Sequence, residues 1–398
     1  MSLTPSSTPA DTKEARLALD TSIVQYWLRA HGHDVAEVHV ECQFGAGQSN
    51  PTYLLLLTSA ADVRRRVVLR RKPPGELLKS AHDVEREYRA MAALQDTDVP
   101  VPRMVGLCPG DMVLGVPFYV MEFVDGRVLA DERLPGVSPA ERTAIWTSAA
   151  RTLARLHAVD FRAVGLERHG KLGGGGYAFR QLDVWARQFR AVDALVRRAT
   201  PDDAELHAAS ESMLALEAWL REQLRSFVPE GHEPTCVVHG DYRLGNLILE
   251  PHAPRVAAVI DWEISTLGHP QSDVAYFLAS WFTPSMLGGL ADDAPPGTPT
   301  EEEMVRVYAE AAGVAPPPPR VRAFFRVLMW QRKAAIAHGV YARALQGNAA
   351  APDAARFGQA FQAMVALGVE AMEALQQAEP EAAAGAGAAA TTPISSRL

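Results

Sequence analysis

The chain has 398 residues, of which 48% are hydrophobic and 22% charged, and this predicts a globular protein with a large core divided into two or more lobes. A formal net charge of −8 argues against a nucleic-acid-binding protein, because such proteins usually carry a basic stripe. The three cysteines lie far apart without a C-x-x-C spacing, which predicts neither a disulfide framework nor a zinc site.

The sequence pattern predicts neither a signal peptide nor a membrane helix. The N-terminal residues have no apolar core of the kind found in signal peptides, and no apolar run approaches the roughly 20 residues that a membrane helix needs. We therefore expect a cytoplasmic protein without membrane association. Residues 1–14 show no periodicity and are predicted to be a disordered N-terminus.

The first folded part is predicted to be a small mixed lobe. A helical pattern over Leu17–Ala30 precedes two strand-like runs, 38–44 and 52–57, joined by a loop of small residues. Glycine permits close approach of the backbone to a ligand, so the N–H groups of this loop could close over phosphates. By itself this signal is weak, because hairpins with two glycines are common and most of them bind no ligand. The candidate phosphate-loop residues are Gly45, Gly47, Ser49 and Asn50.

Further elements follow in a regular order. Residues 67–72 are predicted as a third strand, with Arg70 and Lys72 on one face, and residues 83–94 as a helix. Residues 117–124 have the pattern of a buried strand. From Ser138-Pro139 onward the periodicity becomes helical, which marks the beginning of a second, larger lobe.

Residues 165–198 combine basic and aromatic side chains around the four glycines 173–176, which predict a mobile loop. One interpretation is a solvated helix face with apolar packing on its other side. The alternative is a lip that binds an anionic molecule through arginines and covers an acyl chain with Tyr177, Phe179, Trp185 and Phe189. This segment contains seven basic and three acidic residues. The basic ones are Arg168, Lys171, Arg180, Arg187, Arg190, Arg197 and Arg198, and the acidic ones are Glu167, Asp183 and Asp193.

The stretch 236–263 carries the strongest chemical signal in the chain. Its pattern of three short strands places Asp241, Asn246 and Asp261 at neighbouring ends of what we predict to be one small sheet. Asn246 follows Asp241 by five positions, and Asp261 follows Asn246 by 15. Phosphoryl transfer from a nucleotide uses such a set, with one Asp orienting the attacking hydroxyl and the Asn and second Asp binding Mg²⁺. The upstream glycine loop then becomes a phosphate loop.

The rest of the second lobe is predicted to be mainly helical. A helix begins after Gly268-His269 with Asp273 in its first turn, and Thr300 with Glu303 forms a capping box for another. Two long amphipathic helices are predicted at about 321–346 and 353–377. From Glu381 the sequence becomes a low-complexity tail.

The segments HGDYRLGN and IDWE resemble motifs of the aminoglycoside phosphotransferase family, a branch of the protein-kinase-like fold. Longer segments are similar to the phosphotransferase domains associated with acyl-CoA dehydrogenases, and this resemblance covers roughly residues 20–375. They are FGAGQSNPTYLLLL, VVLRRKPPG, DVEREYRAM, PFYVMEFVDGRVL, LGHPQSDVAY and AIAHGVYARALQGNA.

The resemblance implies an α+β, two-lobed fold with a mixed N-lobe at residues 15–125, a mainly helical C-lobe at 126–380 and a tail at 381–398, with ATP bound between the lobes. It places the strand cation at Arg70, with Arg71 and Lys72 as alternatives, and pairs this cation with Glu87 rather than Glu85. A kinase normally has Lys at this strand position. The resemblance also implies an adenine hinge at Met121, Glu122 and Val124, and supporting roles for His239 and Asp273.

The function expected from these features is ATP- and Mg²⁺-dependent phosphorylation of a hydroxyl group on a small molecule. Asp241, Asn246 and Asp261 are the expected catalytic residues, and Asn246 with Asp261 the metal ligands. The resemblance suggests a hydroxyacyl-CoA or hydroxy acid as acceptor and an acyl-CoA dehydrogenase as a candidate partner. Two alternatives stay open: an aminoglycoside or other amine-alcohol kinase, and a nucleotide-binding pseudokinase without turnover.

Overall fold

The computed structural model describes residues 19–44, 50–73, 83–172, 176–227, 234–346 and 354–389. Three residues of the predicted phosphate loop, Gly45, Gly47 and Ser49, lie outside the described residues. The same holds for the predicted disordered N-terminus and for the first three glycines of the loop at 173–176.

The chain divides into two units, each assembled from separate stretches of sequence. The first comprises the residues up to Ala130 together with Val159–His169 and Leu244–Ser265, and the second comprises Asp131–Ala158, Gly170–Arg243 and the chain from Thr266 onward. The division falls between Arg243 and Leu244. Asp241 therefore belongs to the second unit, whereas Asn246 and Asp261 belong to the first.

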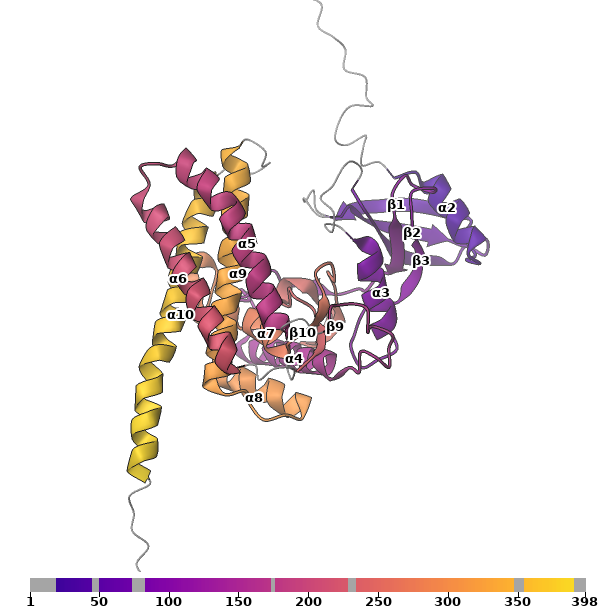
Figure 1. Cartoon of the computed structure of the whole chain (residues 1–398). Helices are drawn as coiled ribbons and strands as arrows, with labels where there is room; N and C mark the ends of the chain where they lie inside the picture. The colour runs from indigo at the N-terminus through magenta and orange to yellow at the C-terminus, as the bar shows by residue number, and fades with distance from the viewer. Residues whose placement is uncertain are drawn as a thin grey trace, which may run out of the picture. The chain divides into compact units, whose positions relative to one another are not determined.

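An antiparallel five-stranded sheet forms the centre of the first unit, and Figure 1 shows helix α2 beside it. The strand order is β1-β2-β3-β5-β4. Apolar residues of α2, Thr21–Ala30, are buried in the same core as the inward side chains of the sheet. The strands are β1 (Glu37–Phe44), β2 (Thr52–Thr58), β3 (Arg64–Arg71), β4 (Met104–Cys108) and β5 (Phe118–Glu122).

These elements follow the sequence pattern closely. Strands β1 and β2 and helix α3 (Val84–Leu94) lie within a residue of their predicted bounds, because runs of strand-favouring residues and a helix cap mark them locally. Strand β3 begins three residues earlier than predicted, since exposed arginines hide its start. A second sheet of the first unit contains β6 (Arg127–Val128), β8 (Leu247–Leu249) and β9 (Val256–Val259) in the order β6-β8-β9.

The predicted single small sheet around Asp241, Asn246 and Asp261 is wrong. Strand β7 (Cys236–Val238), which precedes Asp241, pairs with β10 (Thr266–Gly268), whereas β8 and β9 pair with each other. Asn246 itself ends a 3₁₀ turn, η2, Leu244–Asn246. The loop and this turn separate β7 from β8, so their edges find different partners.

The second unit is mainly helical, and this composition with the antiparallel sheet of the first unit confirms the predicted α+β class. Four of its helices, α5, α6, α9 and α10, lie side by side in Figure 1 and share one hydrophobic core. The helices of this unit are α4 (Pro139–Ala158), α5 (Gly176–Ala199), α6 (Ala204–Phe227), α7 (Pro270–Phe277), α8 (Glu301–Ala312), α9 (Pro319–Leu345) and α10 (Ala354–Ala389). Short 3₁₀ turns follow α7 at η3 (Ala279–Phe282) and η4 (Ser285–Leu287).

The predicted start of α8 is confirmed by its capping box, whereas the predicted end of α10 differs from the structure. The capping box of α8 is complete, with Thr300 Oγ1 accepting from Glu303 N at 3.2 Å and Glu303 Oε2 accepting from Thr300 N at 2.7 Å. Helix α10, in contrast, continues past Glu381 to Ala389, into the segment predicted as a low-complexity tail. Alanine is the strongest helix former, so this Ala-rich sequence extends the helix.

Candidate active site

A partly buried arginine on β3, with 13% of its side chain exposed, contacts three carboxylates of the first unit. Arg70 Nε lies 3.1 Å from Glu87 Oε2, and Arg70 Nη2 lies 3.1 Å from Asp261 Oδ1. Glu263 Oε2 is 3.8 Å from the same Nη2. The structure therefore brings Arg70 and Glu87 together as the sequence suggested, and it adds contacts of Arg70 with Asp261 and Glu263 that the sequence did not indicate.

Glu87 is fully buried and held by several donors. Asn50 Nδ2 donates to its Oε1 at 2.9 Å, and the Tyr119 hydroxyl donates to its Oε2 at 3.0 Å. Asp83 caps α3 by accepting from Arg86 N, which fixes Glu87 in the first turn of the helix. Asn50, predicted in the phosphate loop, thus contacts a carboxylate of the site.

Burial and charge act in opposite directions on this pair. Burial raises the pKa of Glu87 to about 7, although the Arg70 cation lowers it. Burial alone would lower the pKa of Arg70, but Glu87 and the other acidic neighbours raise it overall. Arg70 therefore stays a cation, and Glu87 titrates close to neutral pH.

The neighbouring cation at position 71 has a different environment. Arg71 is buried on the opposite face of β3, where its guanidinium lies 5.5 Å from the centroid of the Tyr53 ring. Lys72 lies beyond the end of β3. Among the three candidates for the strand cation, the described contacts with Glu87 and Asp261 belong to Arg70.

Asp261 has an unusual backbone. Its φ of +67° lies in the left-handed region that non-glycine residues seldom adopt, and such strain concentrates at functional sites. The Ile260 N–H donates to the carbonyl oxygen of Asn246 at 3.0 Å, so the ladder of β8 and β9 holds Asn246 beside the segment that carries Asp261.

The donor set of this segment suits a hard cation. Asp261 offers a carboxylate with a partly exposed side chain, and Asn246 offers an amide oxygen from a neighbouring strand end. Oxygen donors of this kind are those that Mg²⁺ prefers. Within the described ranges no group of three or more His, Cys, Asp and Glu side chains is arranged as a metal site, so a site here depends on Asn246.

The predicted adenine hinge lies at the end of β5. Met121 and Glu122 are its last two residues, and Val124 follows two positions later. The Glu122 N–H donates to the Arg103 carbonyl oxygen at 2.8 Å. The adenine-binding role of these residues stays a prediction.

In the second unit, α7 anchors the loop that leads to Asp241. The buried carboxylate of Asp273 accepts from the N–H groups of His239 at 2.7 Å and Gly240 at 2.8 Å. Burial by itself would raise the pKa of Asp273, but His157, His239 and the Gly240 N–H lower it below its usual value. The predicted supporting role of Asp273 agrees with these contacts.

His239 fixes the backbone of Asp241 directly. The buried imidazole accepts from the Asp241 N–H through Nδ1 at 3.2 Å, and its ring contacts Tyr242 edge to face. Gly240, between the two, has a φ of +84°, a conformation that glycine tolerates best. The sequence-based expectation that His239 steadies the loop agrees with this geometry.

The Asp241 side chain is surrounded by groups that the sequence did not indicate. Arg243 Nε lies 3.6 Å from its Oδ2, and the Tyr276 hydroxyl is hydrogen-bonded to it. Burial and then the Asp241 charge raise the pKa of Tyr276. Burial lowers the pKa of Lys333, while Glu132 and Asp241 oppose this change. Arg243 follows Asp241 by two residues, whereas Tyr276 comes from α7 and Lys333 from α9, and no local spacing links these two to Asp241.

The basic run on α5 is largely neutralised by acids. Arg190 pairs with Glu217 at 2.6 Å, Arg197 pairs with Asp193 and Glu211, and Arg187 lies 3.9 Å from Asp183. Tyr177 and Trp185 line a pocket, whereas Phe189 is buried in the helical core. These pairs favour the interpretation of a solvated helix face for this arginine run.

Comparison with known proteins identifies relatives along most of the chain. Residues 41–304 match the phosphotransferase enzyme family. The chain is 38% identical over 342 residues to acyl-CoA dehydrogenase family member 11 of Rattus norvegicus, covering 84% of this chain and 41% of the relative. It is 40% identical over 330 residues to acyl-CoA dehydrogenase family member 10 of Mus musculus, covering 82% of this chain and 28% of the relative. It thus spans about two fifths or less of the length of these curated relatives.

A solved structure supports the fold independently. A crystal structure from Ralstonia eutropha, provisionally described as that of an aminoglycoside phosphotransferase, matches with a TM-score of 0.74 and 37% identity. The match covers 89% of this chain and 98% of that chain. These comparisons confirm the predicted family resemblance and the protein-kinase-like fold.

Proposed function

Since the chain belongs to the phosphotransferase enzyme family, we propose that it transfers the γ-phosphoryl group of ATP to a hydroxyl group of a small molecule, with Mg²⁺ as cofactor. The observation that carries this proposal is the Arg70 guanidinium, which contacts both Glu87 and Asp261 at 3.1 Å. Arg70 and Asp261 are 191 positions apart in sequence and meet there, with Arg70 at the strand position where a kinase normally has Lys.

The first unit would supply nucleotide and metal binding. Arg70, oriented by Glu87, has the planar fork that suits phosphate oxygens, and Asn246 with Asp261 would hold Mg²⁺. When bound, Mg²⁺ neutralises charge on the transferred phosphoryl group. Asp261 has to exchange its contact with Arg70 for the metal, which its partly exposed carboxylate permits.

The second unit would supply proton transfer. Asp241 is held by the His239 and Asp273 contacts, and its carboxylate would orient the acceptor hydroxyl and take its proton. Tyr276 and Arg243 fix the orientation of that carboxylate. No covalent enzyme intermediate is needed in this scheme.

We propose a hydroxyacyl compound, a hydroxy acid or its CoA thioester, as acceptor. The names of the similar acyl-CoA dehydrogenase family members support this class, and they make an acyl-CoA dehydrogenase a candidate partner. An aminoglycoside is a polycation and would require acidic surroundings, whereas Arg243 and Lys333 lie near Asp241.

The function is tested by coupled ADP release across hydroxyacyl-CoAs, free hydroxy acids, aminoglycosides and choline-like amines. We expect acceptor-dependent ADP formation with a hydroxyacyl compound. Absence of ADP formation with every acceptor, despite ATP binding, would contradict the proposal and favour a pseudokinase.

The metal assignment has its own test in Asp261→Asn and Asn246→Ala. Both variants should require more Mg²⁺ for turnover and for nucleotide binding, because each removes a hard oxygen ligand or its charge. Circular dichroism should show that both remain folded. Equal apparent Mg²⁺ affinity in both variants and in the wild type would show that these residues do not bind the metal.

A further inference from the structure

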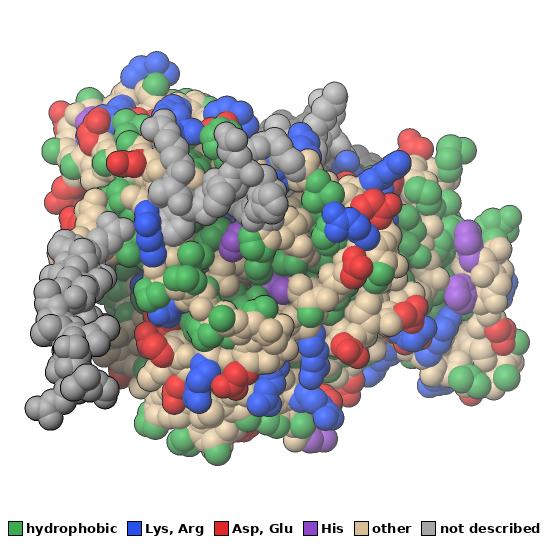
Figure 2. All heavy atoms as spheres, turned by 60° about the horizontal axis from the view of Figure 1, so that its bottom comes forward, with side chains coloured by type: hydrophobic (Ala, Val, Ile, Leu, Met, Phe, Trp, Pro, Cys, Tyr) green, Lys and Arg blue, Asp and Glu red, His purple; other side chains and the backbone are tan. Residues whose placement is uncertain are grey.

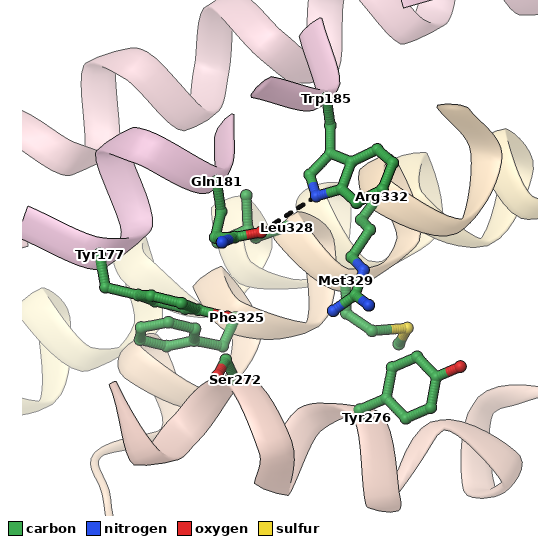
Figure 3. Close-up of a pocket in the computed structure, with 9 residues that line it drawn as sticks. All are labelled: Tyr177, Gln181, Trp185, Ser272, Tyr276, Phe325, Leu328, Met329 and Arg332. Atoms are coloured by element: carbon green, nitrogen blue, oxygen red, sulfur yellow. Dashed lines mark hydrogen bonds between the residues drawn. The ribbon is translucent and has the colours of Figure 1, made fainter. Parts of the chain in front are cut away.

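A pocket in the second unit lies between α5, α7 and α9, and Figure 3 shows its lining. Trp185 and Gln181 come from α5, Tyr276 from α7, and Phe325, Leu328 and Arg332 from α9. The pocket encloses about 20 Å³ and is otherwise open, so it holds a small terminal group while the remainder of a ligand lies along its open side.

One charged residue enters this otherwise uncharged lining. The Arg332 side chain extends between Trp185 and Tyr276 in Figure 3, with its guanidinium carbon 5.5 Å and 5.6 Å from the two ring centroids. The Trp185 N–H donates to Gln181 Oε1 at 3.1 Å, which fixes the indole against the guanidinium. Such flanking by aromatic rings limits Arg332 to one orientation without neutralising its charge.

Arg332 also has unsatisfied hydrogen-bonding capacity. Its Nε is buried and finds no hydrogen-bond partner among the described residues. A buried donor left in this state costs free energy, and a bound acceptor oxygen removes that cost. By contrast, the α5 residues Arg190 and Arg197 both have carboxylate partners.

Tyr276 connects the pocket with Asp241. Its ring lines the pocket, and its hydroxyl is hydrogen-bonded to the Asp241 carboxylate. A ligand held by Arg332 would therefore place its other end near the proposed general base. Its chain would lie along the apolar surfaces of Phe325 and Leu328.

We propose that Arg332 is the specificity residue of the acceptor site and donates hydrogen bonds to the acyl carbonyl or carboxylate oxygen of the phosphorylated molecule. This inference rests on the proposed phosphotransferase function and adds to it the group by which the acceptor is recognised. A cationic acceptor is excluded by the charge of Arg332, and a simple alcohol lacks the oxygen that it binds.

The test compares acceptors of equal chain length with Arg332→Gln and Arg332→Lys variants. The acceptors are positional series of hydroxyhexanoates, their CoA thioesters and the matching hexanediols. Arg343→Gln is the matched control, because Arg343 is an exposed arginine of the same helix. Acceptor and ATP KM values are measured separately for every protein.

We expect Arg332→Gln to raise the KM of the carbonyl-bearing acceptor about 10- to 100-fold, because the variant loses a hydrogen bond from a charged group. The KM values for ATP and for the diols should stay unchanged. Arg332→Lys should recover part of the loss, and Arg343→Gln should behave as wild type. If the KM increase in Arg332→Gln occurs for only one of the two forms, the free acid or the CoA thioester, that form is the one that Arg332 recognises.

Two results would overturn the assignment while leaving the phosphotransferase proposal intact. One is an equal KM increase for diols and hydroxy acids in Arg332→Gln, which would reflect general damage to the pocket. The other is preferred phosphorylation of an amino sugar with no response to Arg332→Gln. Failure of the proposed function looks different, since then the wild type forms no ADP with any acceptor.

Discussion

At the scale of single residues, the arginine at position 70 can contact two carboxylates in different directions, which a lysine at the same position could not do equally well. A lysine presents one point charge, whereas the guanidinium directs Nε toward Glu87 and Nη2 toward Asp261 at the same time. The Nε of Arg70 is close to Glu87 but not aligned for a hydrogen bond, so this contact is an ion pair. The pair is nevertheless important for stability because Glu87 is fully buried.

Arg70→Ala should therefore lower the free energy of unfolding by about 3 kcal/mol at pH 8, because it leaves a buried carboxylate without its cation. Chemical denaturation monitored by circular dichroism measures this loss. The matched control is Arg187→Ala, which removes an exposed arginine and should change stability by less than about 0.5 kcal/mol. A loss below about 1 kcal/mol for Arg70→Ala would contradict the structural role of the pair.

The titration of Glu87 gives a second residue-scale prediction. Its pKa rises from 4.5 to about 7 in the folded protein, chiefly through burial. Between these values the folded state retains a proton that the unfolded chain has released, so the stabilisation is complete below pH 4.5 and is lost as pH rises toward 7. Relative to Glu87→Gln, which does not titrate, the wild type should lose about 3 kcal/mol of unfolding free energy over this interval.

The measurement is the unfolding free energy of both proteins at several pH values from 4.5 to 8, with the difference plotted against pH. Subtraction removes the titrations that the two proteins share. A difference that does not change with pH would show that Glu87 is ionised throughout, as an ordinary surface carboxylate would be.

At the scale of elements, structure that depends on neighbouring residues was predictable, and pairing between distant segments was not. Strands β1 and β2 and helices α3 and α8 were predicted because runs of strand-favouring residues and helix caps depend on residues close together in sequence. The pairing of β7 with β10 was missed, since three residues at Thr266–Gly268 carry too little pattern to predict a strand partner.

The same distinction applies to the candidate site. Asp241, Asn246 and Asp261 could be predicted from their spacing, and Arg70 with Glu87 from the family resemblance. Tyr276, Arg332 and Lys333 could not, because the packing of α7 against α9 brings these three side chains together and no sequence spacing indicates that packing. A pocket residue such as Arg332 becomes a candidate for function only when its neighbours in the structure are known.

Helix α7 makes a prediction at this scale through Asp273. Because this carboxylate accepts two backbone N–H groups of the loop before Asp241, Asp273→Ala should lower kcat more than tenfold and leave the ATP KM nearly unchanged. Steady-state kinetics separates the two effects. Asp273→Asn should recover part of the activity, because its amide oxygen can still accept a hydrogen bond from the loop backbone. Equal kcat in the wild type and in Asp273→Ala would show that α7 does not position this loop.

At the scale of the whole molecule, the proposed chemistry draws on both units. The proposal assigns nucleotide and metal binding to residues of the first unit, and proton transfer and acceptor recognition to residues of the second. On the face shown in Figure 2, basic and acidic side chains are interspersed, in keeping with the overall charge of −8. In the part of the chain that the structure describes, no helix has the length and apolar character required to cross a membrane.

The central claim is that this chain phosphorylates a hydroxyl group with Asp241 as the group that accepts its proton. Asp241→Ala should therefore lower acceptor-dependent ADP formation by at least about 10²- to 10⁴-fold, because positioning and proton transfer are both lost. ATP affinity, measured by calorimetry, should remain close to wild type. Asp202→Ala, which removes an exposed carboxylate of the same unit, is the matched control and should keep full turnover.

The most direct measurement is thus the turnover of Asp241→Ala with a saturating acceptor, alongside its ATP affinity. The account predicts a folded, ATP-binding protein with turnover at or below about one hundredth of wild type. A variant that binds ATP and retains more than about a tenth of wild-type turnover would contradict the assignment of Asp241, because loss of a general base costs more than that.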